Sequence, residues 1–356
     1  MARQVNAMDH AIDRSAPVLV TGATGFVAGW IIRRLLEQGV SVHATVRDPE
    51  NAERLRHLNA LPRADGAALH FFRAELLEPG SFAKAMAGCG VVFHTASPFT
   101  SVVDDPQREL IDPALLGTRN VLEQAAGTDS VRRVVLTSSC AAIFTDAADC
   151  ADAPGGVLTE DVWTRTASLE YQPYSWSKTL AEAEAWKIAQ QARFRLVAIN
   201  PCLIMGPAIG GRPSSESFNI MQRAGQGEFR FGAPRLGLGI VDVRDVAEAH
   251  LAAAFLPEAE GRNIVAGHET DLLAGLMTLQ AKYGDRYALP RRAAPKFLLW
   301  LIAPRLGLSR KFVSRSVDVA WRADTSKGRR ELGLTYRPLQ ETMQDMFQYM
   351  IDQNYF

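Results

Sequence analysis

The sequence lacks an excess of charge of either sign. Lysine plus arginine and aspartate plus glutamate number 39 each, so the formal net charge is zero. Nucleic acids and anionic membranes select proteins with a strong positive excess. The balance gives no support to a binding module for either of them, and we expect no nucleic-acid partner. With 47% hydrophobic residues, the 356-residue chain can bury a large core.

Cysteine is scarce and its spacing is irregular. Cys89, Cys140, Cys150 and Cys202 contain no C-x-x-C pair, and none of the seven histidines lies at ligand spacing from another histidine or a cysteine. Disulfide frameworks and zinc sites depend on such spacings. We therefore expect reduced thiols and no metal site.

Long apolar runs and export signals are also missing. The longest apolar run, Phe297 to Ala303, is far shorter than the ~18 to 20 residues that cross a bilayer. The first sixteen residues contain no apolar centre of the kind found in secretory signals, and no Asn-x-Ser/Thr sequence occurs. We expect a cytoplasmic protein without integral membrane association, in which residues 1–16 form a flexible extension.

A glycine turn in the stretch from Pro17 to Gly39 is the first feature that points to a ligand. Val18 to Val20 predict a buried strand, and a helix with one apolar face follows the turn until Gly39. Gly22 and Gly25 fall where the chain reverses and where a ligand can approach the backbone closely. The first amides of such a helix are unpaired and its dipole is positive there, so a pyrophosphate can bind at this end.

The spacing of this turn resembles that of a known family. Thr21, Gly22, Gly25 and Ala28 resemble the TGxxGxxG turn of the extended short-chain dehydrogenase/reductases, with alanine at the third glycine. The resemblance implies a Rossmann-type dinucleotide site. The turn residues expected to contact the cofactor are Thr21, Gly22, Thr24, Gly25, Phe26 and Val27.

The next strand ends in residues that distinguish the two nicotinamide cofactors. Val40 to Val46 predict a strand, and Arg47 follows it, with Arg54 seven residues later. Arginines at this place accommodate a 2′-phosphate, whereas a carboxylate binds the ribose hydroxyls of NAD. We expect NADPH/NADP+ on the strength of Arg47 and Arg54, while Asp48 is the residue that would favour NAD.

Further strand ends add cofactor contacts. A strand over 68–73 leads to Glu75 and Leu76, which the resemblance places at the adenine ring, and a strand from Val91 leads to Thr95, Ala96 and Ser97. A short helix over 80–87 lies between these strands. His94 is expected to be packed in its strand end rather than catalytic.

A helix over 113–126 carries a pattern that resembles the GTxNVL motif of the family. Its asparagine, Asn120, is a candidate for holding a water in a proton relay, and a structural role is an equal alternative.

Three residues, Ser139, Tyr174 and Lys178, form a candidate catalytic set. A strand over 131–139 delivers Thr137, a cofactor contact, and Ser139 to the carboxyl edge of the sheet, where ligands bind in open α/β folds. Tyr174 and Lys178 share one face of the following helix. An ammonium group beside a tyrosine favours the phenolate, so Tyr174 can give a proton to a carbonyl oxygen that Ser139 orients. Ser138 is the alternative if the register differs by one residue.

The whole chain from Pro17 resembles the dihydroflavonol reductase and cinnamoyl-CoA reductase branch, which also contains bacterial and yeast aldehyde and ketone reductases. The resemblance rests on Arg47-Asp48-Pro49, the TSS of 137–139, YSWSKTLAEAEAW from Tyr174, Asn200-Pro201 and Met205-Gly206-Pro207. It implies an α/β fold with a doubly wound parallel sheet and a smaller mixed carboxyl-terminal region. Residues 17–201 would form the NADP-binding domain, with parts of 236–266 returning to it, and residues 202–356 would mainly bind substrate.

The sequence departs from both plant enzymes at the substrate side. Gln172 to Lys178 lack the NWYCYxK motif of cinnamoyl-CoA reductases, and Phe144 stands where dihydroflavonol reductases have an asparagine. Pro201 and Leu203 are expected at the nicotinamide end. The expected substrate pocket consists of Phe99, Phe144, Gly206 and Phe218.

The resulting expectation is an NADPH-dependent reductase of hydrophobic aldehydes, ketones or keto-esters, present as a monomer or homodimer. A nucleotide-sugar epimerase or dehydratase is the first alternative, and a non-catalytic NADP-sensing regulator is the second. Near the carboxyl end, we expect Phe297 to Ala303 to form an apolar packing helix with a solvated basic flank, and a peripheral membrane contact is the less favoured alternative. The flank consists of Arg305, Arg310, Lys311 and Arg315.

Overall fold

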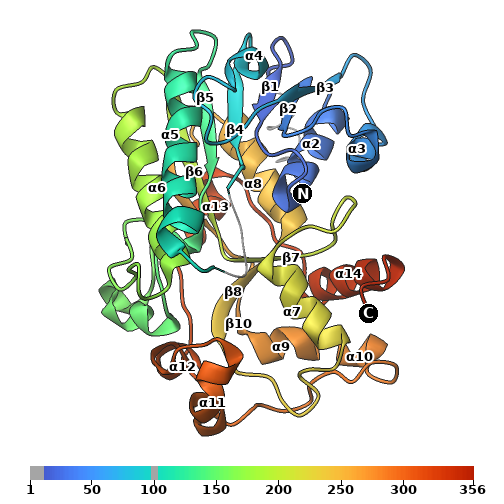
Figure 1. Ribbon diagram of the computed structural model, residues 1–356, viewed down its shortest axis with the longest axis vertical. Helices are drawn as coiled ribbons and strands as arrows, with labels where there is room; N and C mark the ends of the chain where they lie inside the picture. Colours follow the sequence, from blue (N-terminus) through green and yellow to red (C-terminus); the bar gives the residue numbers. More distant parts are fainter. Residues whose placement is uncertain (1–11, 98–102) are drawn as a thin grey trace.

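The computed structural model describes residues 12–97 and 103–356. Its main element is a parallel sheet of seven strands in the order β3-β2-β1-β4-β5-β6-β9 (Figure 1). The strands are β1 (Val18–Val20), β2 (Val42–Val46), β3 (Leu69–Arg73), β4 (Val91–His94), β5 (Arg133–Thr137), β6 (Arg195–Pro201) and β9 (Gly261–Val265).

Helices cover both faces of this sheet. On one face α2 (Phe26–Glu37), α3 (Ala52–Asn59) and α8 (Val243–Phe255) share a core with the strands, and on the other face α4 (Ala83–Met86), α5 (Asp112–Ala126) and α6 (Pro173–Ala189) do so. Strands buried on both sides are nearly continuous apolar runs, as the fully buried β1 is. The expected doubly wound α/β fold is confirmed.

The sequence placed most elements correctly and some boundaries too widely. The helix expected over 80–87 is limited to α4, because Gly80 at φ +77° has left-handed backbone. A five-residue π-helical segment, Gln107–Ile111, precedes α5.

A smaller mixed sheet lies below the large one in Figure 1. Its order is β10-β8-β7, formed by β7 (Leu203–Met205), β8 (Gly237–Asp242) and β10 (His268–Asp271), with β7 parallel and β10 antiparallel to β8. The helices around it are α7 (Glu216–Gly225), α9 (Leu272–Met277), α10 (Gln280–Tyr283) and α14 (Leu339–Asp352). The chain then also returns to the large unit, since α8 packs on α2 and β9 pairs with β6.

The start of the chain is held more firmly than expected. Of the extension expected over 1–16, residues 1–11 lie outside the described residues. Ile12 is buried in the core beside α2, and the Arg14 Nε donates a hydrogen bond to the Gln38 carbonyl at 2.7 Å. Residues 12–16 are therefore anchored to the large unit.

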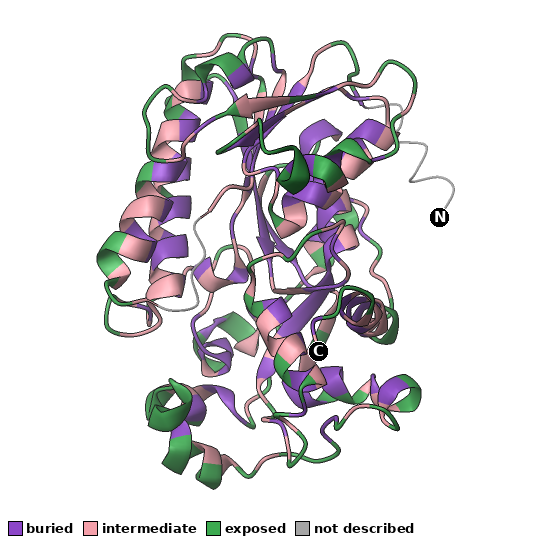
Figure 2. Cartoon of the chain, turned by 45° about the vertical axis from the view of Figure 1, so that its right-hand side comes forward, coloured by how far each residue is buried: buried purple, intermediate pink, exposed green. Residues whose placement is uncertain are grey.

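A helical hairpin at the foot of the molecule also differs from expectation. It consists of α11 (Lys296–Ile302), a 3-10 turn (Ala303–Leu306) and α12 (Arg310–Ser316), and α13 (Ser326–Glu331) follows it. No residue of α11 is buried, so the prediction of an apolar packing helix is wrong. Figure 2 shows the foot of the molecule largely in the exposed colour. Among the described residues, no helix combines the length and hydropathy that a bilayer crossing requires.

Candidate active site

The glycine turn after β1 forms a cradle in which side chains would not fit. Gly22 has φ +66°, and a Cβ added to it would lie 3.1 Å from Ala96. Gly25 precedes α2 as its N-cap, donates a hydrogen bond to the Gly22 carbonyl at 2.9 Å, and offers no side chain to the first helical amides. Those amides therefore remain for an anion, which fits the pyrophosphate of a dinucleotide.

A groove of about 1090 Å³ extends from this turn along the carboxyl edge of the sheet. Its volume suits an extended ligand larger than ordinary small molecules. The expected cofactor residues that line it are Gly22, Thr24, Gly25, Phe26, Arg47, Arg54, Glu75, Leu76, Thr95, Ala96 and Ser97.

The ribose end of the groove carries two exposed arginines. Arg47 and Arg54 line it, and among the described residues neither guanidinium has an ion-pair partner. Asp48 does not line the groove; its carboxylate accepts a hydrogen bond from the Glu50 amide at 3.1 Å. Two cations are therefore available to a 2′-phosphate, and the Asp48 carboxylate is engaged within its own loop.

Lys178 joins the groove to Tyr174. The helix α6 begins at Pro173, and its first two turns present Tyr174 and Lys178 on one face. The Lys178 side chain is 8% exposed, and its Nζ donates to the Ser97 Oγ at 2.9 Å and lies 5.6 Å from the centre of the Tyr174 ring. One buried ammonium thus contacts the groove wall and the tyrosine.

The two serines at the end of β5 have different surroundings. The Ser138 Oγ is buried and donates to the Glu182 carboxylate at 2.6 Å. Ser139 is half-buried, and its Oγ accepts a hydrogen bond from the Ala141 amide at 3.1 Å, which leaves its hydroxyl proton for a ligand. Ser139 is therefore the serine that can contact a substrate oxygen.

Sequence reasoning missed a buried polar network beneath this site. The Glu182 carboxylate, in a residue only 1% exposed, accepts hydrogen bonds from the Asn200 Nδ2 at 2.8 Å and the Arg262 Nε at 2.6 Å. Arg262 also donates to the carbonyls of Glu160 at 2.8 Å and Val162 at 2.6 Å. Glu182 follows Lys178 by four residues, so helical spacing could have indicated that it faces the same side.

Several expected cofactor residues have their side chains bound inside the protein. Thr21 is fully buried, and its Oγ1 accepts from the amides of Thr95 at 3.1 Å and Ala96 at 3.0 Å. The Thr137 hydroxyl shares a hydrogen bond of 2.7 Å with the His250 Nε2. Cofactor contacts of Thr21 and Thr137 stay predictions, and the side chain of Thr21 ties the ends of β1 and β4 together.

His94 is packed in its strand end, as expected. Its ring shares a hydrogen bond with the Thr21 Oγ1, and burial, with the charge of Lys178 as the second cause, lowers the pKa of His94 to about 3. The ring is therefore neutral and does not act as a catalytic base.

Four further residues do not line the groove. Val27 packs partly buried on the core, Pro201 is buried, and Leu203 packs partly buried against the smaller core. The Asn120 Nδ2 donates to the Leu76 carbonyl at 3.0 Å, a structural contact that holds the adenine side of the groove. A proton relay through Asn120 stays a prediction.

The expected substrate pocket is largely not formed. Phe218 is 2% exposed and packs edge-on against Phe26 in the smaller core, and Gly206 is buried in a turn against Val243. Both assignments are wrong, because long-range packing buries these residues. Phe99 lies outside the described residues. Phe144 is half-buried, with its ring 5.7 Å from that of Trp321.

The groove is closed by a segment that the sequence did not single out. Arg212, Pro213 and Ser214, between β7 and α7, line it opposite the glycine turn. Arg212 donates to the carbonyls of Gln353 and Asn354 and lies 4.6 Å over the Tyr355 ring. The carboxyl-terminal residues thus fix one wall of the groove.

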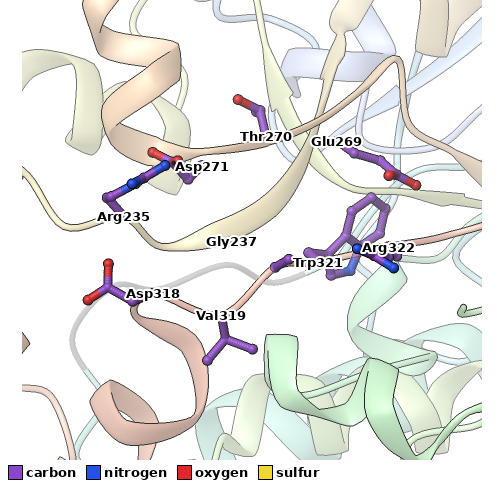
Figure 3. A pocket seen from close by; sticks show the side chains of 10 residues that line it. Arg235, Gly237, Glu269, Thr270, Asp271, Asp318, Val319, Trp321 and Arg322 are labelled. Carbon is purple, nitrogen blue, oxygen red and sulfur yellow. Dashed lines mark hydrogen bonds and ion pairs between the residues drawn. The ribbon is translucent and has the colours of Figure 1, made fainter. Parts of the chain in front are cut away.

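A second cavity of about 450 Å³ lies beside the smaller sheet (Figure 3). Its wall is polar, with Arg235 and Asp271 forming an ion pair at 3.4 Å and Glu269, Asp318 and Arg322 nearby. Ser139, Tyr174 and Lys178 do not line it. They do not line the groove directly either, but Lys178 reaches its wall through the hydrogen bond to Ser97.

Comparison with known proteins agrees with this geometry. Residues 18–267 match the model of the NAD dependent epimerase/dehydratase family. The chain is 36% identical over 333 residues to a cinnamoyl-CoA reductase of Medicago truncatula, covering 92% of this chain and 93% of the relative. It is 38% identical over 303 residues to a putative anthocyanidin reductase of Ginkgo biloba, covering 80% and 87%.

Solved structures resemble the whole fold. The yeast methylglyoxal/isovaleraldehyde reductase Gre2, complexed with NADPH, has a TM-score of 0.75 at 25% identity, and the match covers 96% of this chain and 100% of that chain.

Proposed function

The chain belongs to the NAD-dependent epimerase/dehydratase family, and we propose that it reduces a hydrophobic aldehyde, ketone or keto-ester with NADPH, with Tyr174 as the proton donor. Its relatives are reductases, and the chain is an oxidoreductase that acts on carbonyl or hydroxyl groups with a nicotinamide cofactor. The observation that carries the finer proposal is the position of Lys178, which contacts both the groove wall at Ser97 and the face of Tyr174.

The residues of the groove fit NADPH. The glycine turn would hold the pyrophosphate, Leu76 and Glu75 would border the adenine, and Arg47 with Arg54 would bind the 2′-phosphate. When bound, NADPH supplies the hydride that reaches the carbonyl carbon. Lys178 would hold the ribose hydroxyls at the nicotinamide end, beside Ser97.

The protein supplies the proton. Ser139 donates a hydrogen bond to the substrate carbonyl oxygen and orients it, and Tyr174 transfers its phenolic proton to that oxygen. The Lys178 ammonium, 5.6 Å from the centre of the Tyr174 ring, stabilises the negative charge that develops on Tyr174 as its proton leaves.

The substrate class follows from the side chains next to Ser139. Phe144 follows Ser139 by five residues in the sequence, and its ring lies 5.7 Å from that of Trp321, which supports an apolar aromatic surface on the substrate side. Such a surface favours an apolar carbonyl compound over a nucleotide sugar, whose diphosphate needs cationic groups.

The test is consumption of NADPH with a panel of aromatic and aliphatic aldehydes, ketones and keto-esters, with NADH in parallel and nucleotide sugars as controls. We expect turnover of carbonyl compounds with NADPH preferred. Turnover of nucleotide sugars alone would contradict the substrate class and favour the epimerase or dehydratase alternative.

Replacement of the proton donor tests the mechanism. Tyr174→Phe should lower kcat by a factor of about 10² to 10⁴, because it removes general acid catalysis, while NADPH affinity measured by fluorescence titration stays nearly unchanged. Retained turnover would show that another group donates the proton. Wild-type protein that binds NADPH but turns over no carbonyl compound would favour the sensor alternative.

A further inference from the structure

An unusual apolar surface lies on the hairpin of α11 and α12 (residues 296–316). Of the twelve large apolar side chains that are exposed among the described residues, seven fall between residues 297 and 308, each between 39% and 65% exposed. We refer to these seven as the apolar ridge: Phe297, Leu298, Trp300, Leu301, Ile302, Leu306 and Leu308. Single exposed apolar residues are ordinary, but a contiguous group marks an interaction surface.

Contacts between α11 and α12 hold the hairpin in place and leave the apolar ridge exposed. Leu299 packs on a small core of Ala303, Val313 and Val317, and the Lys296 Nζ donates to the carbonyls of Ser314 at 3.0 Å and Val317 at 2.6 Å. These contacts fix α11 against α12. The outer side borders a shallow hollow of about 490 Å³ lined by Lys296, Phe297, Trp300 and Leu301.

A second anchor ties the hairpin to the body. Arg315 of α12 pairs with Asp146 at 2.9 Å and Asp149 at 2.6 Å, so it is not the solvated cation that the sequence indicated. Lys311 lies 3.7 Å over the Tyr171 ring. The hairpin is thus braced against the loop that follows Ser139, with the ridge left uncovered.

The sequence segment that contains the ridge has charges of one sign. From Arg286 to Ser316 the chain has eight lysines and arginines and no aspartate or glutamate, although the whole chain has zero formal net charge. Arg305 and Arg310 are exposed beside the ridge, and the Arg310 guanidinium lies 4.5 Å over the Trp300 ring. The eight are Arg286, Arg291, Arg292, Lys296, Arg305, Arg310, Lys311 and Arg315.

The exposed apolar side chains and the positive charge together indicate what kind of partner binds the ridge. A symmetric contact between two copies would place the same cationic surface against itself, which like charges oppose. A nucleic acid would complement the cations and leave the leucines and Trp300 exposed. Short apolar helices flanked by lysine and arginine are typical of segments that lie in the headgroup region of an anionic bilayer.

We propose that the apolar ridge and its arginines dock the protein peripherally on an anionic lipid surface. The ridge inserts among the acyl chains near the headgroups, and Arg305 and Arg310 lie at the level of the lipid phosphates. This contact is independent of the reaction proposed above and brings the loop after Ser139 close to the membrane.

The experiment is sedimentation of the full-length protein with vesicles of phosphatidylcholine containing phosphatidylglycerol, compared with vesicles of phosphatidylcholine alone. We expect a partition coefficient at least about tenfold higher for the anionic vesicles, and a decrease as salt rises, since each basic residue near the surface contributes about fivefold. Equal binding to both vesicles, or no binding to either, would overturn the proposal.

Variants locate the contact. Trp300→Glu with Leu301→Glu should reduce partitioning at least about tenfold, and Arg305→Ser with Arg310→Ser should remove the preference for anionic vesicles. Leu116→Glu on α5, where the leucine is 42% exposed, is the matched control and should bind vesicles like the wild type. Unchanged Tm values and unchanged NADPH affinity would show that the variants fold.

Light scattering after size-exclusion chromatography separates lipid from a second copy. A stable dimer that becomes monomeric in the Trp300→Glu and Leu301→Glu variant would show that another chain covers the ridge and would overturn the proposal. An oligomeric state that is the same in wild type and variant, together with the loss of vesicle binding, would support it.

Discussion

At the scale of single residues, adjacent side chains near the groove differ in their surroundings. One is available to a ligand, and its neighbour in the sequence is hydrogen-bonded within the protein. Arg47 faces the groove, while Asp48, the next residue, hydrogen-bonds its own turn. The Ser139 Oγ accepts a hydrogen bond from the Ala141 amide, whereas the Ser138 Oγ donates to Glu182. Adjacent residues of similar type therefore have different tasks, and substitutions at them should give different readouts.

The arginines at the ribose end should set the cofactor preference. Arg47→Ser should raise the KM for NADPH about tenfold to hundredfold and change the KM for NADH little, because a hydrogen bond to a charged group contributes about 1.5 to 3 kcal/mol. Steady-state kinetics with both cofactors provides the measurement. Arg56→Ser is the control, since Arg56 is exposed on the same helix as Arg54 and does not line the groove. An equal rise for NADPH and NADH would contradict the assignment.

Substitution of Ser139 should affect kcat, whereas substitution of Ser138 should affect the free energy of unfolding. Ser139→Ala should lower kcat about 10²- to 10³-fold with little change in Tm, because it removes a hydrogen bond that strengthens in the transition state. Ser138→Ala should cost about 1 to 3 kcal/mol of unfolding free energy, because it leaves the buried Glu182 with one hydrogen bond fewer. Urea unfolding and kinetics on the same preparations check both. The reverse pattern would mean that Ser138 is the catalytic serine.

At the scale of elements, α6 is positioned from its buried side. Tyr174 at its start is half-buried, and Glu182, two turns further along the same face, is fixed by Arg262 of β9. Arg262 also binds carbonyls of the loop after Ser139. This ion pair therefore connects the helix, the edge strand and the loop that follows Ser139.

Removal of one partner of this pair should destabilise the protein strongly. Arg262→Met should cost about 3 to 5 kcal/mol of unfolding free energy, because it leaves the Glu182 charge buried and uncompensated. The double variant with Glu182→Leu should recover part of this loss. Arg193→Met, which breaks an ion pair of two exposed side chains with Asp129, should change the unfolding free energy by less than ~0.5 kcal/mol. A similar small effect at Arg262 would contradict the role of the network.

Features that depend on residues close together in the sequence could be predicted. The glycine turn and the spacing of Tyr174 and Lys178 are local patterns, and the structure brings Lys178 to the groove wall as expected. Arg262 could not be connected to Glu182 in this way, since eighty residues separate them. Phe218 was misplaced for the same reason, because its aromatic neighbours are distant in the sequence: Phe26, Tyr349 and Tyr355.

The hairpin of α11 and α12 shows a second limit of prediction from sequence. A helix that is apolar on all sides normally indicates burial, and α11 has this composition. Burial requires a partner surface, and the described part of the chain provides one only for Leu299. Sequence pattern therefore described the helix correctly and not its surroundings.

At the scale of the whole molecule, buried histidines should make stability depend on pH. Burial lowers the pKa of His94 to about 3 and that of His250 to about 4, against ~6.5 in an unfolded chain. Between pH 6.5 and 4 the unfolded state therefore binds protons that the folded state does not. The unfolding free energy should fall as the pH decreases through this window and level off below the folded pKa values.

A variant isolates this contribution from those of other groups. Burial raises the pKa of Asp146 and Asp245, which acts in the opposite direction at low pH. Urea unfolding of wild type and His250→Gln at several pH values should show a shallower dependence in the variant between pH 6.5 and 4, whatever its absolute stability. Parallel curves would mean that His250 is accessible to protons in the folded state.

The position of β9 has a consequence for how such a protein can be rearranged in evolution. β9 pairs along β6, and α8 covers α2, yet in the sequence both lie between β8 and β10, two strands of the smaller sheet. A fragment ending at Pro201 would present β6 as a bare edge and leave Glu182 without Arg262. The nucleotide-binding half is therefore not a cassette that can be exchanged at one crossover point. Exchange of substrate specificity between relatives must insert new segments between β6 and β8, or after β9, while the interleaved scaffold is inherited intact.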